Sequence, residues 1–190
     1  MRHPSLLFSP IMILNKEWLC KETKCVIVDA MRNTTFPTQV CSVARALEVI
    51  GEWWTLLIIR EAFFGTERFS DFEERLGIAK NVLSERLAKL VQAGVMTRTA
   101  ATGRGNPQLY ELTEMGRDLL PIIVALMQWG DTWIYGRDGA PIRVVERKTG
   151  HAVKRVQLLS QQGALMSLEN LKVVPGPGAN AAIRRRFVSE

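Results

Sequence analysis

The sequence has few of the residues from which catalytic and metal sites are usually built. Only three cysteines and two histidines occur in 190 residues. Cys20, Cys25 and Cys41 make no disulfide framework, and no histidine stands near them at a zinc-ligand spacing. No arranged Ser/His/Asp set and no phosphate-binding glycine loop is recognisable. We therefore expect no enzymatic activity, no cofactor and no metal ion.

Long hydrophobic runs are also missing. A membrane-spanning helix needs about 20 apolar residues, and no run of that length occurs. The first 15 residues are rich in apolar side chains, but serine and proline interrupt them and no clear small-residue cleavage site follows. The sequence therefore predicts no signal peptide, no membrane partner and a cytoplasmic location.

The net charge of +6 is unevenly distributed along the chain. Residues 41–135 contain ten Lys or Arg and twelve Asp or Glu, which gives this part a net charge of −2. Residues 1–40 contribute +2 and residues 136–190 contribute +6. An anionic partner such as DNA therefore has to be bound through locally placed charge rather than through a uniformly basic domain.

Two short helices joined by a tight turn are predicted within residues 68–96, RFSDFEERLGIAKNVLSERLAKLVQAGVM. The apolar residues of the first helix recur three and four positions apart: Phe69, Phe72 and Leu76. Ser70 precedes Glu73 by three residues, which is the spacing of an N-terminal capping box. Gly77 can adopt the left-handed conformation that ends a helix.

The second helix is predicted to have one apolar and one polar face. The apolar face holds Leu83, Leu87, Leu90 and Val91, and Gly94 ends the helix. The polar face holds Asn81, Ser84, Glu85, Ala88 and Lys89. The two helices fit a helix-turn-helix, in which the second helix lies in the major groove of DNA. An ordinary helical hairpin with a solvated polar face fits these residues equally well.

A β-hairpin is predicted directly after the second helix. Its strands are Thr97–Ala100 and Leu109–Thr113, around a loop rich in glycine, asparagine and proline. Arg98 and Arg104 make the hairpin basic, since no acidic residue occurs from residue 92 to residue 110. A hairpin in this place is the wing of a winged helix, whose basic tip contacts phosphates or the minor groove. The hairpin therefore favours DNA binding.

Residues 41 to about 135 resemble the HxlR-type winged helix-turn-helix regulators, which are relatives of the MarR group. The matching pieces are the Cys41–Ser42–Val43 start, ALEVIGEWWTLLIIREAFFG, the stretch 68–96, and the second wing strand with Leu112, Thr113 and Gly116. Leu120–Pro121, Leu126, Trp129 and Gly130 match as well. The resemblance implies a mainly α fold with a small β wing, and a homodimeric, sequence-specific DNA-binding transcriptional regulator that acts as a repressor. A protein-interaction module that keeps the fold without binding DNA is the alternative.

DNA contacts are assigned to residues 79–89 and to the wing. Relatives usually have a serine at position 79 that caps the helix, and its replacement by Ala79 loses about 1 kcal/mol. Asn81 is the best candidate for reading a base, because its amide can form two hydrogen bonds with adenine. Glu85 also faces outward, where it can accept from cytosine or repel phosphate. The remaining predicted contacts, chiefly with phosphates, are Lys80, Ser84, Arg86, Lys89, Arg98 and Arg104.

Two helices are predicted before the helix-turn-helix. The second, from Trp53 to Phe64, is apolar on all sides, so its aromatic residues are expected in the core. The first runs from Cys41 to about Leu47, and in several relatives a cysteine at this place senses oxidants or electrophiles. A helix N-terminus favours a reactive thiolate, so oxidation or alkylation of Cys41 is predicted to shift the dimer and release DNA. A small side chain that only packs is the alternative.

A wide apolar stripe follows the wing from Glu114 onward, and Pro121 is expected to kink the helix that carries it. The stripe holds Met115, Leu119, Ile122, Ile123, Leu126, Trp129 and Trp133. A small winged-helix core cannot cover so wide a stripe, so we expect a two-fold dimer interface there, at Leu119, Ile122, Ile123, Leu126, Trp129 and Trp133. Such a dimer sets two recognition helices about 34 Å apart.

The two flanks of this domain are predicted separately. Residues 1–40 are expected to be an irregular arm, in which Met31 is a candidate natural start; an arm that contributes to the dimer is the alternative. Residues 136–178 are expected to form a small β appendage, with Ile142–Glu146 paired to Ala152–Leu158 and Val173–Val174 as a possible edge. Residues 179–190 are expected to be a flexible basic tail, in which Arg184–Arg186 contact DNA or are simply solvated.

The appendage is expected to be metal-free. Some longer relatives have Cys-Gly-His and Cys-x-x-Cys in this segment, which look like a small zinc ribbon. The corresponding residues here are Thr149–Gly150–His151 and Leu159–Ser160–Gln161–Gln162. A lone histidine cannot hold zinc, which needs about four ligands in a structural site.

Overall fold

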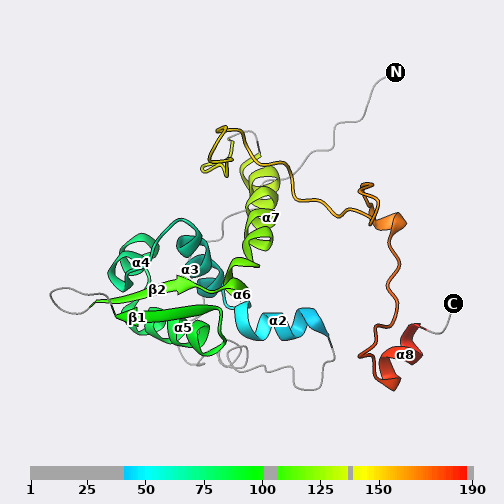
Figure 1. The fold of residues 1–190 in the computed structure, drawn as a ribbon, viewed down its shortest axis with the longest axis horizontal. Coiled ribbons are helices and arrows are strands. Elements are labelled where there is room, and N and C mark those ends of the chain that lie inside the picture. Colours follow the sequence, from blue (N-terminus) through cyan, green and yellow to red (C-terminus); the bar gives the residue numbers. More distant parts are fainter. Residues whose placement is uncertain (1–40, 101–106, 137–138, 188–190) are drawn as a thin grey trace, which may run out of the picture. The chain divides into compact units, whose positions relative to one another are not determined.

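The computed structural model describes residues 41–100, 107–136 and 139–187, and has the mainly helical fold with a small β wing that the sequence predicts (Figure 1). The first helices are α2 (Ser42–Ile50), α3 (Trp53–Phe63), α4 (Phe69–Leu76) and α5 (Lys80–Gln92). Strands β1 (Met96–Ala100) and β2 (Gln108–Leu112) are followed by helices α6 (Glu114–Arg117) and α7 (Leu120–Gly130). The π-helical turn η1 (Asp131–Tyr135), the 3-10 turn η3 (Leu168–Asn170) and helix α8 (Ala181–Phe187) come last. The arm predicted for residues 1–40 lies outside the described residues.

A hydrophobic core joins the elements from α2 to α7. Its buried side chains are Ile50, Ile58, Ile59, Phe72, Ile78, Leu83, Leu87, Leu90, Val95, Met96, Tyr110 and Ile123. The three leucines of α5 are among them, so the apolar face predicted for this helix is confirmed. Burying one such side chain contributes about 1.5–3 kcal/mol. The core therefore holds α5 in place by one face and leaves its other face open to solvent.

Helix α3 passes through this core, but its first residue lies outside it. Ile58 and Ile59 are completely buried, whereas Trp53, which we expected in the core, is 83% exposed. The prediction treated the helix as equally covered along its length. The neighbouring elements cover its middle turns, and the first residue lies beyond them.

Helix α4 agrees with the prediction at its C-terminal end only. Gly77 has a φ of 61°, the left-handed conformation, and ends α4. The predicted capping box is wrong, because α4 begins one residue before Ser70, whose hydroxyl donates to Asp71 Oδ1 at 3.0 Å. The earlier start follows from Arg68, whose extended backbone pairs with Leu109 of β2.

The wing strands are antiparallel and each begins one residue earlier than predicted. Their pairs run from Met96 with Leu112 to Ala100 with Gln108. Thr113 then links the wing to α6, since its hydroxyl donates to Gly94 O at 2.7 Å and accepts from Gly116 N at 3.1 Å. A Cβ added at Gly116 would lie 2.2 Å from Val95 O, so only a glycine permits this close approach.

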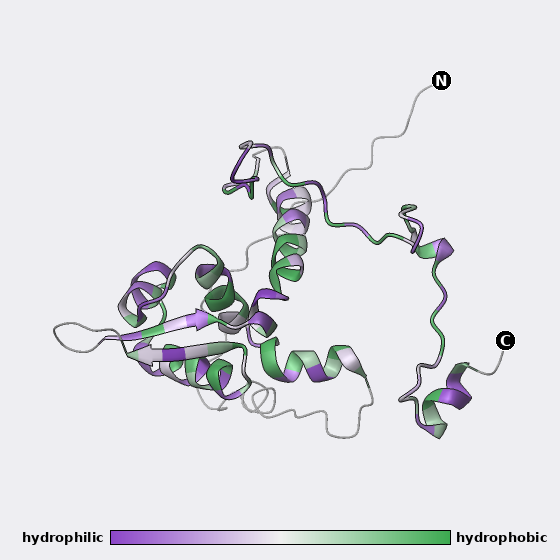
Figure 2. Cartoon of the chain, in the orientation of Figure 1, coloured by the Kyte–Doolittle hydropathy of each residue, from purple (hydrophilic) through white to green (hydrophobic). Residues whose placement is uncertain are grey.

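The prediction of one kinked helix after the wing is wrong. Helix α6 ends at Arg117 and α7 begins at Leu120, with Pro121 in its first turn. A proline has no N–H, and first-turn N–H groups have no acceptor within their helix, so proline is tolerated at this place. Apolar residues run along α7 (Figure 2). Of the helices in the described residues, none combines the length and the apolar character needed to cross a membrane.

Residues 139–187, which we call the C-terminal segment, form only a small part of the predicted pair of strands, a single antiparallel bridge between Val145 and Ala152. Val153 N donates to Val144 O at 3.0 Å, which closes a short hairpin, and Met166 N donates to Leu158 O at 2.9 Å in a second one. Pairing stops after Val153 because the next backbone groups bond to Gln128 of α7 instead. Among the described residues, no edge strand forms at Val173–Val174.

Helix α8 lies where a flexible tail was predicted. Asn180 stands just before it, and its side-chain oxygen accepts a hydrogen bond from Ile183 N at 2.9 Å. Asparagine is among the strongest N-cap residues, so the sequence carries a signal for this helix. Residues 181–187 of the predicted tail are therefore helical.

Candidate nucleic-acid interface

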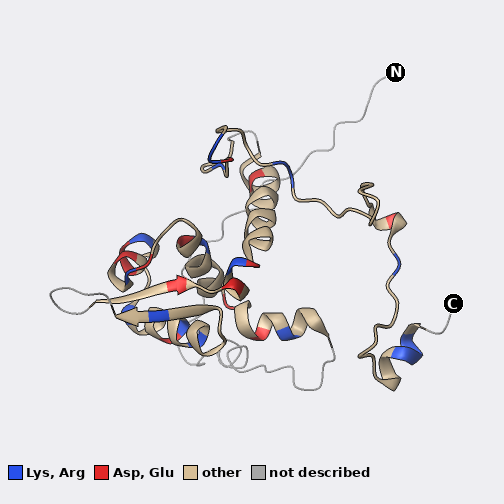
Figure 3. Ribbon diagram, viewed as in Figure 1, with Lys and Arg blue, Asp and Glu red and all other residues tan. Residues whose placement is uncertain are grey.

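Helix α5 presents an exposed polar face opposite its buried leucines. The exposed residues of this face are Lys80, Asn81, Ser84, Glu85, Ala88 and Lys89. Positive and negative side chains are mixed along α4 and α5 rather than gathered into a uniformly basic surface (Figure 3). A helix held by one face, with the other face polar, has the form needed to enter a major groove.

The first turn of α5 begins without a side-chain cap. Ala79 is the N-cap residue and makes no side-chain hydrogen bond, as the sequence predicts. Lys80 and Asn81 follow in the first turn, both exposed. Lys80 Nζ lies 3.9 Å from Glu73 Oε2 of α4, an ion pair in which the lysine side chain is 77% exposed. Such an exposed pair contributes about 0–1 kcal/mol, so Lys80 is free to exchange Glu73 for another anion.

Two cations surround the carboxylate of Glu85. Lys89 Nζ and Arg86 Nη1 each lie 3.0 Å from Glu85 Oε1. The hydrogen bond from Lys89 and then the charge of Arg86 lower the pKa of Glu85 below its ordinary value. An ionised carboxylate only accepts hydrogen bonds, so at a base edge Glu85 is suited to the amino group of cytosine.

Arg86 does not fit the phosphate-contacting role that we predicted for it. Only 7% of the residue is exposed. Its Nη2 lies 3.3 Å from Glu52 Oε2, so it joins α5 to the residue before α3. The phosphate contact was predicted from the charge of Arg86, but this position lies on the core side of α5. Arg86 therefore acts as an internal anchor that also steadies Glu85.

The wing offers one described basic side chain near α5. Arg98 lies in β1 and is exposed, with its backbone paired to Tyr110 of β2. Arg104 lies outside the described residues, so its contact with DNA stays a prediction.

The comparisons with known proteins agree with this geometry. A family profile described as HxlR-like helix-turn-helix matches residues 49–138. The HTH-type transcriptional regulator Rv3095 of Mycobacterium tuberculosis is 43% identical over 143 residues, which cover 75% of this chain and 90% of that protein. The chain belongs to the HxlR-like helix-turn-helix family. It is a transcriptional regulator of the HxlR/MarR-like type.

Another HTH-type transcriptional regulator and two solved structures are similar as well. YvaP of Bacillus subtilis, an HTH-type transcriptional regulator, is 33% identical over 91 residues, 47% of this chain and 84% of that protein. The candidate transcription factor PA1607 is 41% identical, with a TM-score of 0.71 over 75% of this chain and all of that one. PA1374 of Pseudomonas aeruginosa, also a candidate transcription factor, is 36% identical, with a TM-score of 0.56 over 77% of this chain and all of that one.

The predicted dimer face of this HxlR-like regulator is apolar and largely exposed. Ile122, Leu126, Trp129 and Trp133 are exposed and Leu119 is half-buried against the core, whereas Ile123 is buried within the core. Ile123 is therefore not available to a partner, because one side of α7 packs inward. Val43 and Leu47 of α2 are exposed too, so a second apolar patch lies near the start of the domain.

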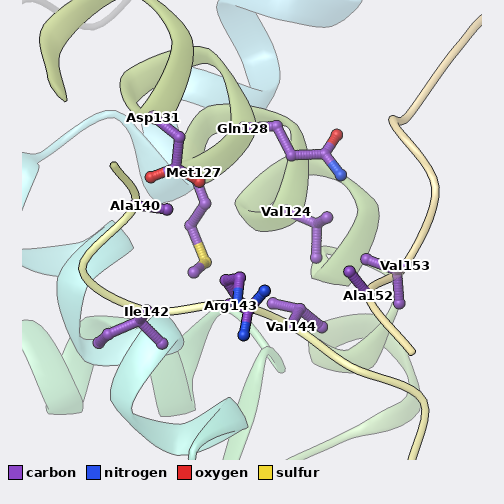
Figure 4. A pocket seen from close by; sticks show the side chains of 10 residues that line it. All are labelled: Val124, Met127, Gln128, Asp131, Ala140, Ile142, Arg143, Val144, Ala152 and Val153. Carbon is purple, nitrogen blue, oxygen red and sulfur yellow. The ribbon is translucent and has the colours of Figure 1, made fainter. Parts of the chain in front are cut away.

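Two hollows lie along α7. An apolar groove is lined by Pro121, Ile122, Ala125, Leu126, Trp129 and Val156. A smaller pocket of about 190 Å³ lies between α7 and the first hairpin of the C-terminal segment, with the side chain of Met127 at its centre (Figure 4). Asp131 and Arg143 stand among its otherwise mostly apolar lining. Both hollows include residues of the C-terminal segment, which therefore contributes to the surface of α7.

Cys41 is the N-cap residue of α2 and is exposed, so the expected position at a helix N-terminus is confirmed. The alternative, a small buried residue that only packs, is wrong for this structure. The redox role of Cys41 stays a prediction.

Proposed function

We propose that this HxlR-like regulator is a homodimer that binds double-stranded DNA in a sequence-specific manner and represses transcription. The observation that carries the proposal is the division of α5 into two faces. Leu83, Leu87 and Leu90 are buried in the core, whereas the side chains opposite them are exposed and polar. A helix held in this way is presented to a partner rather than packed against its own chain.

Base reading falls to the first two turns of α5. Asn81 offers an amide that can bond adenine at two atoms, and Ser84 and Glu85 follow one turn later on the same face. Glu85 favours a cytosine, because its carboxylate is held ionised by Lys89 and Arg86. Sequence preference is thus assigned to three side chains of one helix face.

Phosphate contacts fall to the basic residues around that face. Lys80 stands in the first turn, Lys89 two turns later and Arg98 on the wing, all exposed; Arg104 is assigned to the wing tip on the sequence alone. These contacts set affinity and position without reading sequence.

Dimerisation is supported by the exposed apolar side chains of α7 and α2. An exposed stripe of leucine, isoleucine and tryptophan in water is unfavourable, and a two-fold interface buries it twice. A dimer also places two α5 helices on successive turns of one DNA face. Repression follows if such a dimer occupies a promoter.

The proposal is tested by measuring binding to a randomised DNA library and to the DNA upstream of the protein's own gene. Asn81→Ala is expected to relax the preference at one base step, whereas Arg98→Ala is expected to weaken all sequences alike. Glu74→Ala, an exposed change on α4, serves as the control. Uniform weakening by Asn81→Ala refutes the base-reading role. A gel shift without any complex favours an interaction module instead.

Control of DNA binding through Cys41 is part of the proposal. Its thiolate can add to the C=C bond of an electrophile, so that a C–S bond forms, the π bond opens and the neighbouring carbon takes a proton from water. It can also attack a peroxide oxygen, so that the O–O bond breaks, a sulfenic acid forms and hydroxide leaves. Cys41 caps α2, which carries the exposed Val43 and Leu47, so a modification there lies beside the proposed interface. Footprinting with and without an electrophile tests this, and Cys41→Ser is expected to remove the response. A response that persists in Cys41→Ser overturns it.

A further inference from the structure

The C-terminal segment, residues 139–187, is rich in apolar side chains but has no core of its own. None of its described residues is buried. The large apolar side chains that stand more than half exposed include Leu158, Leu159, Leu165, Leu168, Val173 and Val174. The extreme case is Leu168, at 87% exposed. So many large apolar side chains in one short stretch indicate a surface that another surface covers.

The segment nevertheless has defined local structure. Its two hairpins, η3 and α8 are closed by backbone and side-chain hydrogen bonds. A segment that buries so little surface usually needs a disulfide, a metal or a covering surface to stay folded. Residues 136–190 contain no cysteine and one histidine, so neither a disulfide nor a thiolate zinc site is available. Packing against another surface, of this chain or of a second one, is the remaining means of support.

The start of this segment is fixed beside the apolar groove on α7. Gln128 Nε2 donates to Lys154 O at 3.1 Å, and Val156 N donates to Gln128 Oε1 at 2.8 Å. The side-chain amide of Gln128 thus donates one hydrogen bond to the segment's backbone and accepts another from it, as the backbone of a neighbouring strand does. Val156, placed in this way, lines the groove together with Leu126 and Trp129. The exposed leucines begin two residues later, at Leu158.

We propose that residues 157–187 of each chain cover the apolar groove on α7 of a second copy, so that the two chains exchange their C-terminal segments. The inference rests on the homodimer proposed above. One two-fold axis relates the two segment–groove contacts, so formation of one dimer covers both grooves and both segments. The occupant is a second copy because this chain carries both halves of the contact and leaves both exposed.

Charge supports the same occupant. Residues 157–187 contain four Lys or Arg and one Glu, a net charge of +3, whereas residues 41–135 carry −2. The segment of one copy is therefore attracted to the body of the other, and opposite charges of this kind raise the rate and specificity of association. DNA is the competing anionic partner for the same basic residues, and the experiment below separates it.

The first test is the dimer affinity of full-length variants. Leu165→Asp and Leu168→Asp each place a charge on an exposed side chain, so neither is expected to unfold the chain. Each is expected to weaken dimerisation at least about tenfold, because one buried leucine contributes about that much to association. Gln161→Asp introduces the same charge change at an exposed polar site of the segment and is expected to have little effect. Sedimentation over a concentration series measures all of them.

The second test is cross-linking between two differently tagged full-length copies in which Cys20, Cys25 and Cys41 are serine. One copy carries Leu126→Cys in the groove, and the other carries Leu168→Cys in the segment. A bismaleimide is then expected to give a species with both tags. A matched pair of Glu74→Cys, on α4, with Leu168→Cys is expected to give much less.

Each result decides a separate question. A strong two-tag product together with weaker dimers supports the exchange. Dimers that are unaffected by both aspartate variants but lost in Leu126→Asp overturn it, while the homodimer on α7 stands. Unaffected dimers with lost DNA affinity also overturn it, and assign the segment to DNA. A wild-type chain that stays monomeric at every concentration overturns the homodimer itself, and the exchange with it.

Discussion

Replacing Arg86 by methionine is expected to destabilise the fold without removing a phosphate contact. The Arg86 side chain is buried and pairs with Glu52 at 3.3 Å, which ties α5 to α3. Breaking a fully buried pair costs about 3–5 kcal/mol. Glu52 is 41% exposed, so water can solvate its carboxylate after the change, and methionine keeps much of the packing. We therefore expect a loss of about 1–2 kcal/mol, between the buried and the exposed limits.

Urea unfolding of a double-mutant cycle measures this loss. The cycle compares Arg86→Met, Glu52→Gln and the double variant with the wild type. Because the two side chains are in contact, a coupling of about 0.5–2 kcal/mol is expected. Glu85→Gln serves as a second partner test, since Glu85 also contacts Arg86 but is itself exposed.

The salt dependence of DNA affinity supplies the decisive readout. Each phosphate contact contributes about 0.9 to the slope of log affinity against log salt. Arg86→Met is expected to leave that slope unchanged, since the guanidinium is internal. Unchanged stability together with a slope reduced by about one per subunit would show that Arg86 contacts phosphate, and the anchor role would then be wrong.

Three further predictions concern single residues. Gly116→Ala is expected to lose about 1–3 kcal/mol in thermal unfolding, because its Cβ would lie 2.2 Å from a backbone oxygen; Gly130→Ala, where a Cβ meets open space, is the control and should not destabilise. Ala79→Ser is expected to gain about 1 kcal/mol in urea unfolding by supplying the missing cap; no gain would mean that the first-turn N–H groups are otherwise satisfied. The Glu85 carboxyl is expected to titrate below its ordinary pKa by NMR, and Lys89→Ala to raise that pKa. Because the folded pKa is lowered, the stability from this carboxylate is present above the ordinary pKa and is lost as pH falls through the lowered one.

The parts of the fold that depend on local pattern were predictable from the sequence. The spacing of Leu83, Leu87 and Leu90 determines which side of α5 is buried, and the left-handed glycine at Gly77 ends α4 as expected. These features depend on residues within one or two turns of each other. The exposed polar face of α5 follows from the same periodicity.

The parts that depend on distant contacts were not predictable. Arg86 is internal because Glu52, 34 positions earlier, is brought beside it by α3. Ser70 does not cap α4, because Arg68 pairs with Leu109 of β2 and the helix begins before Ser70. The strand expected after Ala152 stopped because Gln128, on another element, binds its backbone. In each case a long-range partner overrode a local preference, and no local pattern reports such a partner.

If the chain binds DNA as proposed, the modest charge of the interface makes dimerisation a condition for tight binding. If Lys80, Lys89, Arg98 and Arg104 each contact one phosphate, a single subunit has a salt slope of about −3.6, and a dimer about −7. Lys89 is already paired with Glu85 at 3.0 Å, so a subunit that keeps this pair has a slope nearer −2.7. One subunit therefore gains little from counterion release at physiological salt. In the proposed dimer, the apolar face of α7 would therefore also determine whether α5 can hold DNA.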